Sequence, residues 1–224
     1  MLAPMPLDTL DFRTGEAPNA SIIILHGLGA DANDFVPVAQ QLDLRAVGDV
    51  RYVFPNAPTR PVTINGGMRM RAWYDILGME LARREDEPGL RASVAELQAL
   101  IEHEIALGIP ASRIVLAGFS QGCAMTLLAG LRAPQRLAGL VGMSGYLPLA
   151  ATTAAERSPA NSDVPVFLGH GRFDPVVPLA GGIAARDMLI KLGHPVEWHD
   201  YPMQHSVCAE EIEHLNAWLL KVLG

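Results

Sequence analysis

The chain has 224 residues, of which 50% are hydrophobic and 18% are charged, and this composition excludes an intrinsically disordered protein. Its 24 acidic and 17 basic residues give a net charge of −7, which disfavours nucleic acid as a partner. A basic pair, Arg83–Arg84, runs directly into three acidic residues. The length suits one domain that spans residues 1–224, and the 21 glycines and 17 prolines predict many turns.

The sequence carries no feature that indicates secretion or a membrane anchor. The N-terminal segment lacks the basic and apolar regions of a signal peptide, and no apolar stretch approaches the ~20 residues of a membrane-spanning helix. Two cysteines, Cys123 and Cys208, are too few for a disulfide framework. We therefore expect a soluble cytoplasmic protein with free thiols and no stable membrane insertion. Its oligomeric state stays open, a homodimer included.

The chain alternates runs typical of strands with stretches typical of helices. Residues 7–12 alternate apolar and polar side chains, which predicts an edge strand. Buried strands are predicted from short runs rich in β-branched residues, each ended by glycine, proline or a polar residue. These runs lie at 21–25, 51–54, 113–117, 137–143, 164–169 and 196–201. Apolar residues at helical spacing predict helices at 90–105 and 212–222. The stretch 121–132 is apolar nearly all round, which predicts a helix buried on more than one side.

Buried strands separated by helices predict an α/β fold with a mainly parallel central sheet and helices on both faces. The longest stretch without a regular pattern is 55–75. A loop of that length in a compact domain usually has a function, so we expect it to border a site.

The sharpest chemical signal is Gly118-Phe-Ser-Gln-Gly122, which follows a predicted strand and opens a predicted helix. This G-x-S-x-G pattern is typical of a nucleophile elbow, in which the serine lies on a tight turn between strand and helix. It predicts Ser120 as a nucleophile. The alternative is a glycine-rich helix start in which Ser120 only caps the helix.

A serine nucleophile needs a base, and the base needs a carboxylate that orients it. His205 follows the last predicted strand and precedes the last helix, which makes it the best candidate for the base. His170 is its main rival, but it precedes the best acid. That acid is Asp174, in the loop after the strand at 164–169, and the second candidate is Asp200.

Acyl transfer also requires N–H donors for the oxyanion. One donor should be the backbone N–H of Gln121, directly after the serine. The other should come from the glycine-containing loop at 26–29, where we assign it to Leu28. This loop lacks the lysine of a phosphate-binding loop.

Together these segments resemble the carboxylesterase, lysophospholipase and acyl-protein thioesterase family of small α/β-hydrolases. The matching motifs lie, in the family's order, at 26–31, 55–58, 61–67, 71–75, 118–122, 170–171, 174–178 and 205. The resemblance implies the triad Ser120, Asp174 and His205, with Leu28 and Gln121 as oxyanion donors. One departure is Ala72, where many relatives have a serine.

The resemblance also implies that the 55–75 segment, with Trp73, helps to wall an acyl-binding site, and we expect Met70 and Val177 as further substrate contacts. Three methionines, Met68, Met70 and Met79, either line an apolar channel or pack in the core.

We therefore expect a serine hydrolase that cleaves small-molecule carboxylic esters of short to medium acyl chains through an acyl-enzyme. The alternatives are an acyl-protein thioesterase or lysophospholipase and, outside enzymes, a non-catalytic binding protein with the hydrolase fold. No cofactor is expected, and no metal, because the histidines lack ligand spacing. Cys123 is expected in the core and Cys208 at a helix start.

Overall fold

A computed structural model describes residues 7–78 and 85–224, so Met79 and Arg83–Arg84 lie outside the described residues. Its centre is a seven-stranded sheet in the order β1-β3-β2-β6-β7-β8-β9. The strands are β1 (Thr9–Arg13), β2 (Ala20–Leu25), β3 (Val50–Pro55), β6 (Ile114–Phe119), β7 (Gly139–Met143), β8 (Val166–Gly171) and β9 (Val196–Tyr201). All neighbours are parallel except β1, which pairs antiparallel with β3 at one edge. The predicted parallel sheet and edge strand are confirmed.

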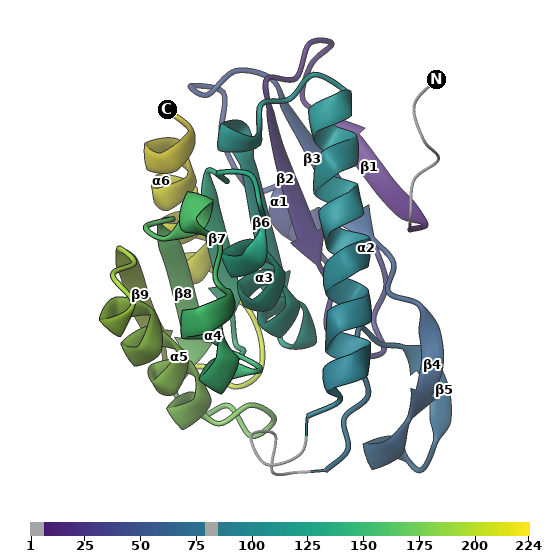
Figure 1. Ribbon diagram of the computed structural model, residues 1–224. Helices are drawn as coiled ribbons and strands as arrows, with labels where there is room; N and C mark the ends of the chain where they lie inside the picture. Colours follow the sequence, from purple (N-terminus) through teal and green to yellow (C-terminus); the bar gives the residue numbers. More distant parts are fainter. Residues whose placement is uncertain (1–6, 79–84) are drawn as a thin grey trace.

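Helices cover both faces of this sheet. They are α1 (Val36–Ala39), α2 (Glu87–Ala106), α3 (Gln121–Arg132), α4 (Ala150–Glu156), α5 (Leu179–Lys191) and α6 (Ala209–Leu223), with short 3₁₀ turns η2 (Ala111–Arg113) and η3 (Pro159–Asn161). Helices α2 to α5 lie on one side, and α1 and α6 on the other (Figure 1). Side chains alternate along each strand, so Ile23 packs in the core under α2 and α3 whereas Ile22 and Ile24 pack under α1 and α6.

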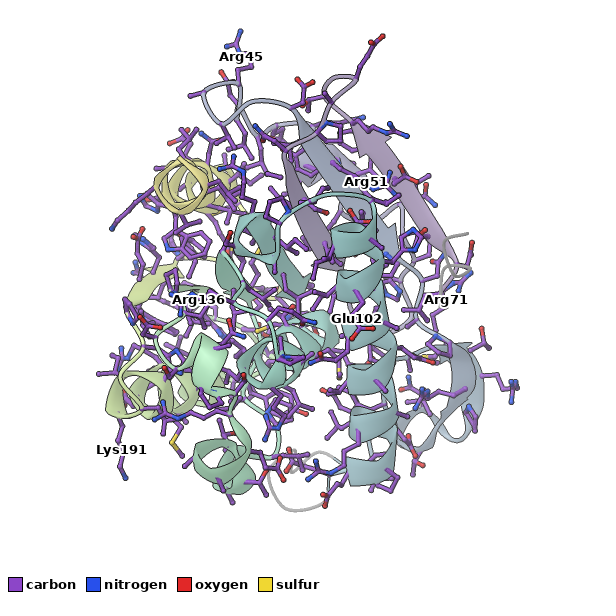
Figure 2. The ribbon with its side chains drawn as sticks, turned by 45° about the horizontal axis from the view of Figure 1, so that its top comes forward. Arg45, Arg51, Arg71, Glu102, Arg136 and Lys191 are labelled. Atoms are coloured by element: carbon purple, nitrogen blue, oxygen red, sulfur yellow. The ribbon has the colours of Figure 1, made fainter. Side chains whose placement is uncertain are left out.

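The prediction of an irregular loop at 55–75 is wrong. The segment folds into an antiparallel hairpin of β4 (Thr59–Val62) and β5 (Met68–Arg71), joined through the 3₁₀ turn η1 (Thr63–Asn65). Gly66 and Gly67 close it with φ angles of 66° and 79°, which favour glycine. Arg71, labelled beside the hairpin in Figure 2, donates to the Ala57 carbonyl at 3.2 Å and ties the hairpin to the chain after β3.

Among the described residues, no helix combines the length and apolar character needed to cross a bilayer.

Candidate active site

The carboxyl ends of the parallel strands carry the residues singled out by the sequence. Leu28 follows β2, Ser120 and Gln121 follow β6, Asp174 follows β8, and His205 follows β9. Strands β2 and β6 are neighbours, although the chain continues from β2 to β3 on the other side. Such a reversal of strand order leaves a crevice beyond the carboxyl ends, where α/β proteins bind their ligands.

Ser120 lies in the sharp turn between β6 and α3. Its backbone angles, φ 56° and ψ −117°, are rare for a residue with a side chain. Glycines are needed on both sides, because a Cβ atom at Gly118 would lie 2.3 Å from the Gly122 backbone, and one at Gly122 would lie 2.2 Å from Leu25 O. Ser120 is the N-cap residue of α3, but its hydroxyl makes no capping hydrogen bond, which favours the nucleophile elbow over a capping role.

Asp174 and His205 are hydrogen-bonded to each other. Asp174 Oδ2 lies 2.6 Å from His205 Nδ1, and the Asp174 side chain is fully buried. The other carboxylate oxygen accepts the backbone N–H groups of Val176 at 2.8 Å and Val177 at 2.9 Å. These bonds fix the carboxylate, which in turn orients the imidazole with Nε2 on the side away from Asp174. That is the arrangement of an acid and base in serine hydrolases.

The imidazole of His205 also packs against Phe119, which the sequence analysis did not single out. Their ring centroids lie 4.7 Å apart, and Phe119 in turn packs against Phe35 at 5.6 Å. Because Phe119 directly precedes Ser120, the elbow itself supplies one wall for the imidazole. The G-x-S-x-G pattern leaves this position free, so the motif carries no signal for it.

A cavity of about 330 Å³ adjoins the elbow. Ser120, Leu28 and Gln121 line it together. Its other described lining residues are Ile64, Asn65, Tyr74, Ile76, Gly78, Tyr146, Pro175, Val176 and Val177. Within the described part of the chain, neither the Leu28 N–H nor the Gln121 N–H has an acceptor. Two such donors beside a serine are what an oxyanion hole requires.

The loop that carries Leu28 is held from two sides. The Gly29 N–H donates to the Arg71 carbonyl at 2.9 Å, and the Ala57 N–H donates to His26 Nε2 at 3.1 Å. Burial lowers the pKa of His26, which favours the neutral imidazole whose Nε2 accepts this bond. The hairpin and the segment after β3 therefore fix the loop.

The three expected substrate contacts lie in different places. Val177 lines the cavity, whereas Trp73 and Met70 are not among its described lining residues. The Trp73 indole is fully buried and donates its Nε1–H to the His26 carbonyl at 3.0 Å. The wall position expected of Trp73 is occupied by its neighbour Tyr74.

The methionines of the hairpin are not among the described lining residues, although Met70 contacts one of them, Asn65. The Met70 sulfur accepts a hydrogen bond from Asn65 Nδ2 at 3.3 Å, and Met68 is 64% exposed. Met68 therefore does not pack in the core, because it faces solvent on a projecting strand.

The Gln121 side chain and two tyrosines fix the cavity wall. Gln121 Oε1 accepts the Trp73 N–H and Gln121 Nε2 donates to the Tyr74 carbonyl, both at 2.8 Å. The Tyr74 and Tyr146 hydroxyl oxygens lie 2.9 Å apart and join this wall to the loop after β7. Burial raises the pKa of Tyr74, and that of Tyr146 to about 12, so both stay protonated at neutral pH.

The two rival residues have other partners. Asp200 forms an exposed ion pair with Arg172. His170 is 1% exposed, and its Nε2 lies 2.9 Å from the Val177 carbonyl oxygen. Neither is among the described residues that line the cavity beside Ser120.

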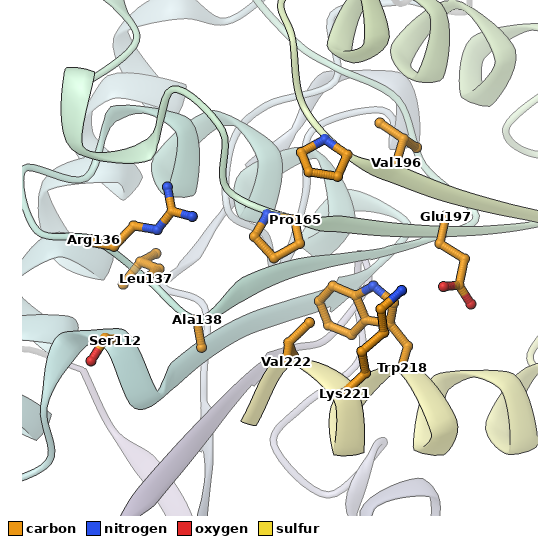
Figure 3. Close-up of a pocket in the computed structure, with 11 residues that line it drawn as sticks. Ser112, Arg136, Leu137, Ala138, Pro165, Val196, Glu197, Trp218, Lys221 and Val222 are labelled. Atoms are coloured by element: carbon orange, nitrogen blue, oxygen red, sulfur yellow. The ribbon is translucent and has the colours of Figure 1, made fainter. Parts of the chain in front are cut away.

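A larger cavity, of about 680 Å³, lies at the opposite end of the sheet. Arg136, Pro165, Val196, Trp218 and Lys221 belong to its lining, near the amino ends of β7, β8 and β9 (Figure 3). None of the predicted site residues is among its described lining residues, so size alone does not identify the candidate site.

The two cysteines lie where the sequence predicts, Cys123 in the core and Cys208 at a helix start. Cys123 is buried, and burial raises the pKa of its thiol to about 12, so its thiolate is scarce at neutral pH. Cys208 is the N-cap residue of α6. Over residues 7–78 and 85–224, no three His, Cys, Asp or Glu side chains are grouped so that they could hold a metal ion.

The sequence matches the model of the Phospholipase/Carboxylesterase family over residues 13–223. The chain belongs to this family. Acyl-protein thioesterase 1 of Mycosarcoma maydis is 43% identical over 226 residues, which cover 94% of both chains. Among solved structures, acyl-protein thioesterase 2 of Zea mays matches with a TM-score of 0.86 and 30% identity, over 97% of this chain and 99% of that one.

SOBER1 of Arabidopsis thaliana is also similar, with a TM-score of 0.87 and 29% identity over 92% of this chain and 99% of that one. These neighbours confirm the predicted α/β-hydrolase fold. The family and the relatives' names establish a hydrolase of the esterase and thioesterase class. The relatives' names favour the thioesterase alternative over the expected carboxylesterase.

Proposed function

We propose that this protein is a serine hydrolase of the acyl-protein thioesterase type, which cleaves the thioester of an S-acylated cysteine. One observation carries the proposal: Ser120 lines a cavity together with Leu28 and Gln121, whose N–H groups have no acceptor among the described residues. The hydrogen-bonded pair of Asp174 and His205 supplies the base. The thioester is proposed because the relatives that match over nearly the whole chain are named acyl-protein thioesterases.

In the acylation step, Ser120 Oγ attacks the thioester carbonyl carbon while His205 Nε2 takes the hydroxyl proton. The Leu28 and Gln121 N–H groups stabilise the negative charge on the carbonyl oxygen, and Asp174 stabilises the imidazolium. The carbon–sulfur bond then breaks, and His205 returns the proton to the leaving thiolate. The acyl group remains on Ser120.

In the deacylation step, the oxygen of a water molecule attacks the acyl-serine carbonyl carbon while His205 takes a proton from that water. The carbon–oxygen bond to Ser120 breaks, and His205 reprotonates the serine. A carboxylic acid leaves. The apolar walls formed by Ile64, Ile76 and Val176 favour an acyl chain in the cavity, because its apolar surface is removed from water.

The first experiment replaces Ser120 with alanine. The variant should remain folded and lose at least about 10⁴ in kcat, because the residual rate comes from binding and the oxyanion hole alone. A fluorophosphonate probe should label the wild-type protein and not Ser120→Ala. Turnover at the wild-type rate by Ser120→Ala would overturn the proposal, and absence of labelling in the wild type would favour a non-catalytic binding protein.

A second candidate is the expected carboxylesterase, and the name of the family model favours it. Two octanoyl peptides that differ only in a cysteine thioester or a serine ester separate the two functions. We expect kcat/KM to be at least about ten-fold higher for the thioester, equivalent to about 1.4 kcal/mol of activation free energy. The reverse order would assign the protein as a carboxylesterase, and lysophosphatidylcholine tests the lysophospholipase alternative in the same assay.

A further inference from the structure

His170 occupies a closed site directly beneath the loop that carries Asp174. It is the penultimate residue of β8 and 1% exposed. A Cβ atom at Gly182 of α5 would lie 2.5 Å from His170 Nδ1, so the imidazole fits only because that helix position has no side chain. The Trp198 ring of β9, which also borders Gly182, lies near the imidazole with ring centroids 6.4 Å apart.

A hydrogen bond of His170 reaches the active site. Its Nε2 lies 2.9 Å from the Val177 carbonyl oxygen, so the ring nitrogen must donate to it. The N–H of the same Val177 donates to Asp174 Oδ1, as does that of Val176. The turn from Asp174 to Val177 is therefore held at both ends, by the carboxylate on one side and by the imidazole on the other.

The turn controls the direction of the carboxylate. With Oδ1 engaged by two backbone N–H groups, only Oδ2 is left to face His205 Nδ1 at 2.6 Å. If the Val177 carbonyl lost its donor, the turn could relax, and the carboxylate would turn with it. A displacement of about 1 Å at such a position costs about 10²-fold in rate.

The charge of His170 also suits this position. Burial lowers its pKa, which favours the neutral form. Its Nε2 is only 3.7 Å from Asp174 Oδ2, so a cation there would compete with the imidazolium of His205 for the same carboxylate. The neutral ring donates one hydrogen bond and leaves the negative charge to His205.

We propose that His170 is a positioning residue for Asp174: by donating to the Val177 carbonyl, it holds the turn that aims the carboxylate at His205. This inference rests on the proposed function, because it assigns a role within the same triad. His170, the rival candidate for the base in the sequence, thus supports Asp174.

The test compares two substitutions at one position. In His170→Gln the amide Nε2 reaches about as far as the imidazole Nε2 and keeps a donor for Val177, whereas His170→Leu has similar bulk and no donor. On the octanoyl thioester peptide, we expect kcat of His170→Leu to fall about 10- to 100-fold with KM nearly unchanged, less than the ~10⁴-fold loss expected for Asp174→Asn. His170→Gln should recover most of the rate. If His170→Leu does not fold, His170→Asn serves as the variant without a donor, because the shorter asparagine amide does not reach the Val177 carbonyl.

Two further measurements separate positioning from general destabilisation. Val166→Ala removes buried volume from the same strand, away from the site, and should lower the melting temperature without lowering kcat. Proton NMR should show a far-downfield Nδ1–H signal for His205 in the wild type and in His170→Gln, and its loss in His170→Leu.

Wild-type kcat in His170→Leu would overturn the inference, and so would equal losses in the Leu and Gln variants with the downfield signal retained in both. Ser120→Ala, assayed beside them, tests the proposed function separately. If Ser120→Ala stayed active, the proposed function would be wrong. The downfield Nδ1–H signal of His205 would then decide by itself whether His170 positions Asp174.

Discussion

At the scale of single residues, Gln121 combines a structural role with the proposed role of an oxyanion donor. It lines the cavity, and its side-chain amide holds the backbone of Trp73 and Tyr74 through two hydrogen bonds of 2.8 Å. A carboxylate of the same shape keeps the acceptor for Trp73 but loses the donor for Tyr74. The Tyr74 carbonyl is then left unpaired in a buried place, which costs about 1–3 kcal/mol.

For Gln121→Glu we therefore expect a melting temperature several degrees lower and a KM at least about five-fold higher for the octanoyl thioester, because the Tyr74 wall is released. Steady-state kinetics and thermal unfolding measure both effects. The matched control is Gln41→Glu, at an exposed position on the surface. An unchanged KM in Gln121→Glu would show that the wall does not depend on this amide.

The sequence predicted the chemistry of individual residues better than their surroundings. The order of Ser120, Asp174 and His205 along the chain selected two residues that form a 2.6 Å hydrogen bond and a third at the cavity. Trp73 could not be placed in this way, because an aromatic residue after a strand can face either the cavity or the core. Its direction is decided by hydrogen bonds to Gln121 and His26, which are distant in sequence.

At the scale of elements, strands and long helices were predictable because their burial imposes a period on the sequence. Helix α3 also matched its predicted bounds, but through a continuous apolar run without a period, since all its residues except Arg132 are buried. The β4–β5 hairpin was missed because each strand has only four residues, so the alternation of methionine and arginine in β5 is too short to indicate a strand. Asn65-Gly66 nevertheless marks a turn. Helices α1 and α4 are short, with four and seven residues, and give too few turns for a pattern.

Close contact between α3 and β2 provides a prediction at this scale. A Cβ atom at Gly122 would lie 2.2 Å from the Leu25 carbonyl oxygen, whereas one at Gly130 on the same helix would meet the Leu140 side chain at 2.2 Å. A side chain can rotate away and a strand backbone cannot. Both alanines gain the same helix propensity, so we expect Gly122→Ala to melt at least about 5 °C below Gly130→Ala. Equal melting temperatures would mean that the helix shifts freely on the sheet.

At the scale of the whole molecule, a buried glutamate lies on each face of the sheet, and the two differ in their hydrogen-bond partners. Glu104 of α2 is fully buried, and it accepts hydrogen bonds from Ser21 Oγ at 2.9 Å and from Arg51 Nε at 3.2 Å (Arg51 is labelled in Figure 2). Glu211 of α6 is also fully buried, yet neither of its carboxylate oxygens has a hydrogen-bond partner among the described residues. The sequence already indicates the burial of Glu211, because Glu211 shares its helical face with the buried Leu215 and Trp218.

Burial raises the pKa of Glu211 from 4.5 to about 8, and this makes the stability of the fold depend on pH. Between these two values the unfolded chain has released a proton that the folded chain still holds. The contribution of Glu211 to the free energy of unfolding is therefore complete below pH 4.5. It is lost as the pH rises through 8, and the free energy of unfolding falls by up to about 1.4 kcal/mol per pH unit in this window. Glu211→Gln mimics the protonated acid at every pH, so its melting temperature should increasingly exceed that of the wild type from pH 5 to pH 8. Thermal unfolding across this range measures the difference, with the exposed neighbour Glu210→Gln as the control, and parallel curves for Glu211→Gln and wild type would contradict the raised pKa.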